Sequence, residues 1–93
     1  MNELPKDVKR FLNELRRRGI KPDLVAVERT PPPDETYHVY RDDKYEGIRS
    51  ADDVFRERNF VVCGKLTCTA FIDDVIELVL DRIKGRVMEP EEW

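Results

Sequence analysis

The sequence has no run of apolar residues near the roughly 20 that a helix needs to cross a bilayer, which excludes a membrane-spanning helix. Its 93 residues include no glutamine, a single serine and only three asparagines. By contrast, 17 basic and 20 acidic residues make up 40% of the chain. Because proteins of hot environments favour mixed charges over heat-labile amides, this composition predicts a thermophilic source.

Side chains suited to metal binding are also scarce. His38, Cys63 and Cys68 supply three soft ligands, one fewer than a structural zinc site uses, and they form no C-x-x-C pair. We therefore expect no metal and no cofactor. The start of the chain lacks the basic-then-apolar pattern of a signal peptide, which predicts a cytoplasmic protein. There the two cysteines are expected to be reduced and buried, with a disulfide as the alternative in a hyperthermophile.

The length of the chain suits one domain with one modest core. No internal repeat, low-complexity block or long linker divides the sequence. We expect residues 1–93 to form a single compact domain. The segment 86–93 is expected to dock on this domain or on a neighbour through Val87, Met88 or Trp93.

Residues 60–85 carry the strongest structural signal, interpreted as a strand, a short turn and a long helix. Thr69 fits an N-cap and Gly85 fits the residue after the last turn, which predicts a helix over residues 70–84. Its apolar residues would cover an arc of roughly 200°, whereas a surface helix needs about 100°. We expect the excess to pack on a second copy of the chain. This predicted dimer surface contains Phe71, Val75, Leu78 and Trp93.

The remaining elements follow from shorter patterns. Apolar residues at helical spacing predict a first helix over residues 4–18, which Gly19 ends. An apolar run at 24–27 predicts a strand over 24–28, and an alternating run at 36–41 predicts a second strand that forms an antiparallel hairpin with it. The apolar run at 60–63 predicts the third strand.

Between the second and third strands, residues 42–49 are polar and are interpreted as a loop. Ser50 and Asp53 then resemble a capping box, which predicts a short helix over 51–58. The predicted order is therefore α-β-β-α-β-α. We expect an α+β fold, a two-layer α/β sandwich in which the first and third helices cover one face of a three-stranded mixed sheet. The third strand would run parallel to the second, and the open sheet edges offer another route to a homodimer.

Three functional hypotheses follow. The favoured one is a non-catalytic protein-interaction or regulatory module that self-associates and binds a protein partner. It rests on the surplus apolar surface and on opposite charges of the first and third helices. Residues 1–21 hold seven basic and three acidic side chains, although the whole chain has a net charge of −3. The basic side chains on the predicted first helix are Lys6, Lys9, Arg10, Arg16 and Arg17.

The second hypothesis is an RNA-binding module that uses this basic face and Lys65. Without the short helix, the order α-β-β-β-α resembles that of double-stranded RNA-binding domains. Such domains carry a lysine-rich stretch at the start of their last helix, where this chain has residues 68–71 followed by Asp73 and Asp74. Carboxylates at that position repel phosphate, in contrast to the family's lysines. For the basic side of the first helix, an ordinary solvated face is the preferred interpretation, because an overall acidic domain lacks the broad basic footprint of a phosphate binder.

The third hypothesis is a small enzyme or ligand-binding protein that uses His38, Cys63, Cys68, Asp42 or Asp43. General-base catalysis needs a supporting geometry that no motif in the sequence provides. Gly64-Lys65 also lies next to the predicted helix start, where backbone N–H groups and a lysine can bind phosphate. However, the full G-x-x-x-x-G-K-[ST] pattern is absent, so an ordinary turn is the preferred interpretation.

Overall fold

The computed structural model describes residues 3–72 and 77–92. Within these residues the fold is mostly β and contains one long helix, α1. The helical elements are α1 (Lys6–Arg17), α2 (Ala51–Val54) and a short 3-10 helix, η1 (Pro90–Glu92). The strands are β1 (Leu24–Thr30), β2 (Thr36–Arg41), β3 (Lys44–Ser50), β4 (Phe60–Cys63), β5 (Thr67–Phe71), β6 (Glu77–Asp81) and β7 (Arg86–Met88).

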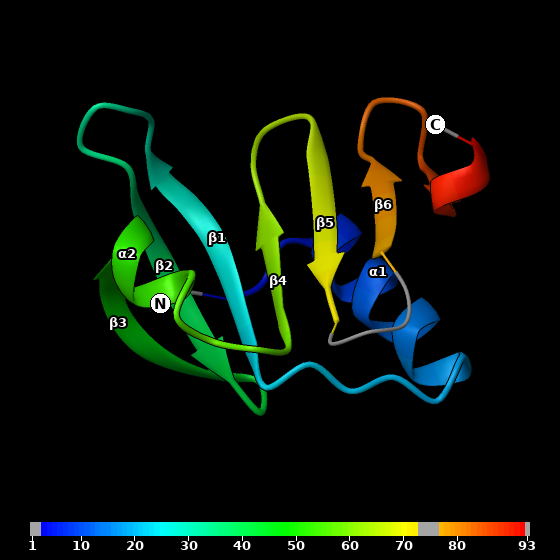
Figure 1. Cartoon of the computed structure of the whole chain (residues 1–93), viewed down its shortest axis with the longest axis horizontal. Helices are drawn as coiled ribbons and strands as arrows, with labels where there is room; N and C mark the ends of the chain where they lie inside the picture. Colours follow the sequence, from blue (N-terminus) through cyan, green and yellow to red (C-terminus); the bar gives the residue numbers. More distant parts are fainter. Residues whose placement is uncertain (1–2, 73–76, 93) are drawn as a thin grey trace.

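All the described strands belong to one seven-stranded sheet in the order β3-β2-β1-β4-β5-β6-β7 (Figure 1). β1 and β4 run parallel, and every other neighbouring pair is antiparallel. The chain leaves β1 toward one edge of the sheet through β2 and β3. After α2 it returns to the middle as β4 and then continues toward the other edge.

α1 covers one face of this sheet, here called the inner face. Its residues Val8, Phe11, Leu12 and Leu15 recur at helical spacing and are buried. Opposite them lie buried side chains from β1, β2, β4, β5 and β6: Val25, Tyr40, Val61, Cys63, Cys68, Ala70, Leu78 and Leu80. Gly19 ends the helix as predicted, because its φ of +78° allows the Ile20 N–H to reach the Leu15 carbonyl at 2.9 Å.

A second, smaller core lies on the opposite face, over β1, β2 and β4. There α2 contributes Val54, which is buried with Leu24, Ala26, Tyr37, Val39 and Phe60. The Ser50 side chain accepts a hydrogen bond from the Asp53 N–H at 3.4 Å, so the predicted cap is confirmed. The helix itself ends at Val54, four residues earlier than predicted.

The predicted helix over residues 70–84, and with it the three-stranded α/β sandwich, is wrong. Thr67–Phe71 and Glu77–Asp81 are strands that pair with each other in antiparallel register. Their side chains alternate: Cys68, Ala70, Leu78 and Leu80 are fully buried on the inner face. An apolar arc of 200° is too wide for one helix stripe. In the strand β6, alternate residues are buried instead: Leu78 and Leu80 are buried, and Val79 between them is half-buried.

Two further expectations about the sheet are corrected. Residues 44–50, predicted as loop, form the edge strand β3, because Asp42 and Asp43 make a two-residue turn with φ of +53° and +65°. Positive φ at both central residues is what a tight hairpin needs, and aspartate tolerates it. The predicted third strand, now β4, runs parallel to β1 and not to β2. The predicted last helix, on which the resemblance to double-stranded RNA-binding domains was based, is replaced by β5 and β6 in the described residues, so that resemblance no longer applies.

Within residues 3–72 and 77–92, no helix has the length and the apolar character needed to cross a membrane.

Candidate functional site

The sheet face opposite α1 carries a group of partly exposed apolar side chains. We call its β4–β7 part the outer face. The outward-pointing residues Val62, Thr69, Val79 and Met88 are neighbours across the four strands, and each is half-buried. Their inner-face neighbours on β4, β5 and β6 are fully buried, and Val87 on β7 is half-buried. The outer face of β4–β7 is therefore the less completely covered side of the sheet.

Three aromatic rings border this outer face beside α2. Phe60 and Phe71 lie directly opposite each other on β4 and β5, with ring centroids 5.1 Å apart in a stacked arrangement. Phe55, just after α2, packs edge-on against both rings. Phe60 is buried, but Phe55 keeps 50% of its surface exposed and Phe71 keeps 36%. Clustered exposed aromatic rings are typical of interaction surfaces, because their burial releases much apolar area from water.

Of the four residues predicted to form a dimer surface, two lie in the described part of the chain, and one of these two is accessible. Phe71 lies on the outer face and is accessible. Leu78 is fully buried beneath α1, so its place in a contact surface was predicted wrongly. Val75 and Trp93 lie outside the described residues. The residues that sequence reasoning missed are Phe55 and Val79, and the alternation of residues 77–81 was the signal that could have placed Val79.

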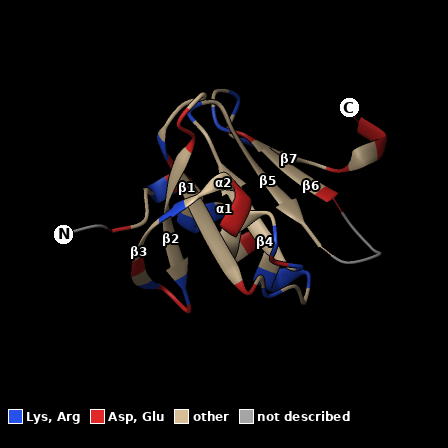
Figure 2. Cartoon of the chain, turned by 60° about the vertical axis from the view of Figure 1, so that its left-hand side comes forward, with Lys and Arg blue, Asp and Glu red and all other residues tan. Residues whose placement is uncertain are grey.

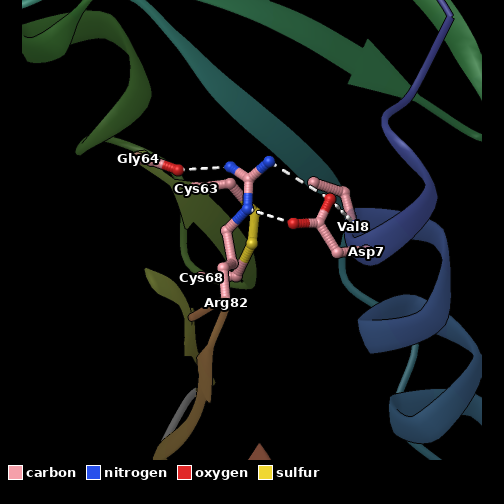
Figure 3. The surroundings of a disulfide bond; sticks show 6 residues. All are labelled: Asp7, Val8, Cys63, Gly64, Cys68 and Arg82. Carbon is pink, nitrogen blue, oxygen red and sulfur yellow. Dashed lines mark hydrogen bonds and ion pairs between the residues drawn. A yellow bond between two sulfur atoms is a disulfide. The ribbon is translucent and has the colours of Figure 1, made fainter. Parts of the chain in front are cut away.

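The two cysteines form a disulfide between β4 and β5 (Figure 3). Cys63 and Cys68 lie directly opposite each other, and both are fully buried on the inner face. The tight turn between them is closed by the Gly64 N–H, which donates to the Thr67 carbonyl at 2.8 Å. The expectation of reduced thiols is therefore wrong, and the disulfide alternative is the one the structure contains.

Arg82 joins this disulfide-bonded hairpin to α1. Its guanidinium lies between the Gly64 carbonyl and the Asp7 carboxylate and donates to both (Figure 3). Asp7 also accepts from the Val8 N–H at 3.1 Å. Burial alone would raise the pKa of the Asp7 carboxyl. The hydrogen bonds and the positive charge of Arg82 outweigh burial and hold this pKa below its ordinary value.

This pairing predicts a specific acid dependence of stability. Because the pKa of Asp7 is lower in the folded protein than in the unfolded chain, its stabilising contribution is complete above about pH 4 and is lost as pH falls through the folded pKa. Asp7→Asn should therefore flatten the fall in unfolding free energy below about pH 4. The measurement is urea unfolding at a series of pH values.

Asp34→Asn is the matched control, because Asp34 is an exposed carboxylate in the connection between β1 and β2. This variant should keep the parent's acid dependence. An equally steep fall in the Asp7→Asn protein would show that the contact with Arg82 contributes nothing to acid sensitivity.

The basic residues predicted as a contact face lie on α1 or at its end, but acidic side chains neutralise part of them. Arg16 pairs with Asp43 at 3.2 Å, and Arg17 pairs with Glu14 at 3.0 Å. Lys6, Lys9 and Arg10 are exposed. Basic and acidic segments alternate over the ribbon and do not separate into two faces (Figure 2). The sequence predicted a basic face on the first helix and an acidic face on the third. The described part of the chain has no such pair of faces, because strands β5 and β6 stand where the third helix was predicted.

The residues proposed for an enzyme do not converge. His38 lies on β2, and its Nδ1 is 2.9 Å from the Tyr45 hydroxyl. Asp42 and Asp43 form the turn between β2 and β3, and Asp42 pairs with Lys21 at 3.3 Å. The cysteines lie in a different part of the sheet and are bonded to each other, so neither has a free thiol. Among the described residues, no three His, Cys, Asp or Glu side chains are grouped so as to hold a metal.

A cleft of about 400 Å³ separates α1 from the hairpin of β2 and β3. Its lining includes Leu12 and Arg16 from α1, with Tyr40 and Asp43 from the hairpin. Arg16 and Asp43 are already paired with each other, so these two charges of the cleft are satisfied within the chain. A comparison of the chain with protein-family models, curated proteins and solved structures finds no match to any of them, so its function has to be argued from these residues alone.

Proposed function

We propose that this chain is a non-catalytic protein-interaction module that acts through self-association. The observation that carries the proposal is the outer face with its exposed aromatic border at Phe55 and Phe71. The argument from a wide helical arc no longer applies, because the helix is replaced by strands. The surplus apolar surface now belongs to one side of the sheet, and sheets bury such faces by packing on each other about 10 Å apart.

A second copy of the same chain is the occupant that fits this face. Glu77 marks one end of the outer face, and Arg86 marks the other end on the adjacent strand, where it lies opposite Asp81 and already pairs with Glu92. A two-fold axis perpendicular to the strands would place Glu77 of one copy opposite Arg86 of the other, on both sides of the apolar row. Such self-complementarity is what an isologous dimer interface requires.

Phe71→Asp tests this interface. A carboxylate at this apolar border, directly opposite Glu77 on β6, would be buried in the contact beside a like charge, so the variant should raise the dimer dissociation constant at least about 30-fold. Sedimentation equilibrium over a range of concentrations measures that constant for the parent and the variant. Circular dichroism of each protein shows whether the fold is retained, so that dissociation is not confused with unfolding.

Ile48→Asp is the matched control, since Ile48 is 45% exposed on the edge strand β3, far from the outer face. This variant should dimerise like the parent. If it dissociates while Phe71→Asp does not, the copies join through sheet edges and not through the outer face. A parent protein that sediments as a monomer at all concentrations would remove the proposal altogether.

The proposed location is the cytoplasm of a thermophilic host. A disulfide is unusual in most cytoplasmic proteins, but intracellular proteins of hyperthermophiles contain many. The disulfide between Cys63 and Cys68 is therefore compatible with this location when combined with the highly charged composition.

A further inference from the structure

A cleft opens where the two parallel strands of the sheet end. β1 and β4 point the same way, but the chain leaves β1 toward β2 on one side and leaves β4 toward β5 on the other. The two connections therefore diverge at the same end of the sheet, at the top of Figure 1. Divergence at the carboxyl ends of neighbouring parallel strands creates a crevice that α/β proteins commonly use for ligands. Here the cleft has a volume of about 530 Å³.

Basic side chains from three separate segments line this cleft. They are Arg29 from β1, Lys65 from the turn between β4 and β5, and Arg82 from the turn after β6. Glu28 is the one carboxylate among the described lining residues, and Val27, Pro31, Cys63 and Gly64 complete the wall. The positive charges lie far apart in the sequence, so only the fold brings them together.

Arg82 is held in place before any ligand arrives. Its guanidinium already donates to the Gly64 carbonyl and to the Asp7 carboxylate. These contacts use three of its five N–H groups, which leaves two for a further acceptor. Arg29 and Lys65 are exposed, and Arg29 has one contact, a hydrogen bond from Nη1 to the Thr36 hydroxyl at 3.4 Å. The cleft therefore combines one fixed cation with two adjustable ones.

We propose that this cleft binds the phosphoryl group of a small phosphate ester. A phosphoryl group has several charged oxygens around one centre and a charge near −2, which suits the two exposed cations and the remaining N–H donors of Arg82 better than a carboxylate does, although Asp7 offsets the charge of Arg82 itself. The cleft is larger than a phosphate ion needs, so the ligand carries further atoms. The Gly64-Lys65 pair belongs to this site through the lysine side chain, since the Gly64 N–H is already bonded to Thr67.

Glycerol 3-phosphate is the probe for a titration followed by amide NMR shifts at constant ionic strength. Saturable shifts are expected at the backbone amides of Arg29, Gly64 and Lys65. Lys65→Ala and Arg29→Ala should each raise the dissociation constant about tenfold, because each removes one charged hydrogen-bond donor. Both residues are exposed, so neither substitution threatens the fold. Lys44→Ala, at the opposite end of the sheet, removes the same charge elsewhere and should leave binding unchanged.

Two additional titrations separate the phosphoryl group from its surroundings. Inorganic phosphate should shift the same amides with weaker affinity, and glycerol should shift none of them. The proposal is overturned if the shifts do not saturate. It is also overturned if sodium chloride reproduces them, or if Lys65→Ala binds as tightly as Lys44→Ala. Because Phe71→Asp alters the outer face and not this cleft, it should bind glycerol 3-phosphate like the parent, which keeps this test independent of self-association.

Discussion

Alanine at Leu78 or at Leu80 is expected to lower the free energy of unfolding by about 2–5 kcal/mol, whereas alanine at Val79 should lower it by about 1 kcal/mol or less. Both leucines are fully buried beneath α1, so truncation leaves a cavity in the closely packed inner core. Val79 points to the outer face and is half-buried. The expected alternation of large, small and large losses is the signature of a strand.

Urea unfolding monitored by circular dichroism measures the three losses, with the disulfide kept intact throughout. The measurements use protein concentrations low enough to keep the chain monomeric. The loss measured for Val79→Ala then contains no contribution from lost dimer contacts. If Val79→Ala costs as much as Leu78→Ala, then neighbouring residues are buried together. That result would restore the helix predicted from the sequence and would remove both β6 and the outer face.

The elements that the sequence predicted well have signals contained within one segment. α1 shows apolar residues at helical spacing and a glycine in the left-handed region at its end. β2 and β4 match their predicted bounds, since β2 shows alternation and β4 is a short apolar run near the centre of the sheet. In each case the local pattern and the tertiary environment favour the same structure.

The region after Cys63 was mispredicted because its local signals suit two structures. Gly85 adopts a φ of +68°, as a residue after a helix would, but it does so in the turn between β6 and β7. Asp81 resembled the polar face of a helix, yet its carboxylate accepts the Ile83 and Lys84 N–H groups in that turn. The alternation of Thr67 to Phe71 was visible in the sequence, and the excessive apolar arc was itself evidence against a helix.

The edge strand β3 could not be predicted from hydropathy. Six of its seven residues are exposed, so no buried face imposes an alternating pattern. Its place is set by the turn at Asp42 and Asp43, and aspartate pairs are a weaker turn signal than Asn-Gly.

The candidate sites were also only partly predictable from local sequence patterns. Phe71 was selected for the wrong reason, and the cations of the cleft meet only because β1, β4 and β6 end near one another.

Loss of the disulfide is expected to lower the free energy of unfolding by about 2 kcal/mol, the chain-entropy value for so short a loop. The bridge closes residues 63–68, which hold the turn between β4 and β5. Because Cys63 and Cys68 are register partners, the bridge also fixes the pairing on which β5, β6 and the contact of Arg82 with Gly64 depend. The measurement compares urea unfolding of the oxidised protein, the reduced protein and the double variant Cys63→Ala/Cys68→Ala.

The double variant should match the reduced protein and should not respond to reductant, which separates the bridge from any other effect of the reducing agent. Reduction leaves two small apolar thiols in the same buried position, so native circular dichroism should persist at moderate temperature. Alkylation of the protein under denaturing conditions, followed by mass measurement, counts its free thiols. Two free thiols in the native oxidised preparation, or equal stability with and without reductant, would contradict a structural role for the bridge. A loss near 2 kcal/mol would instead show that this small domain relies on a covalent link between its two central antiparallel strands, where its core alone provides little reserve.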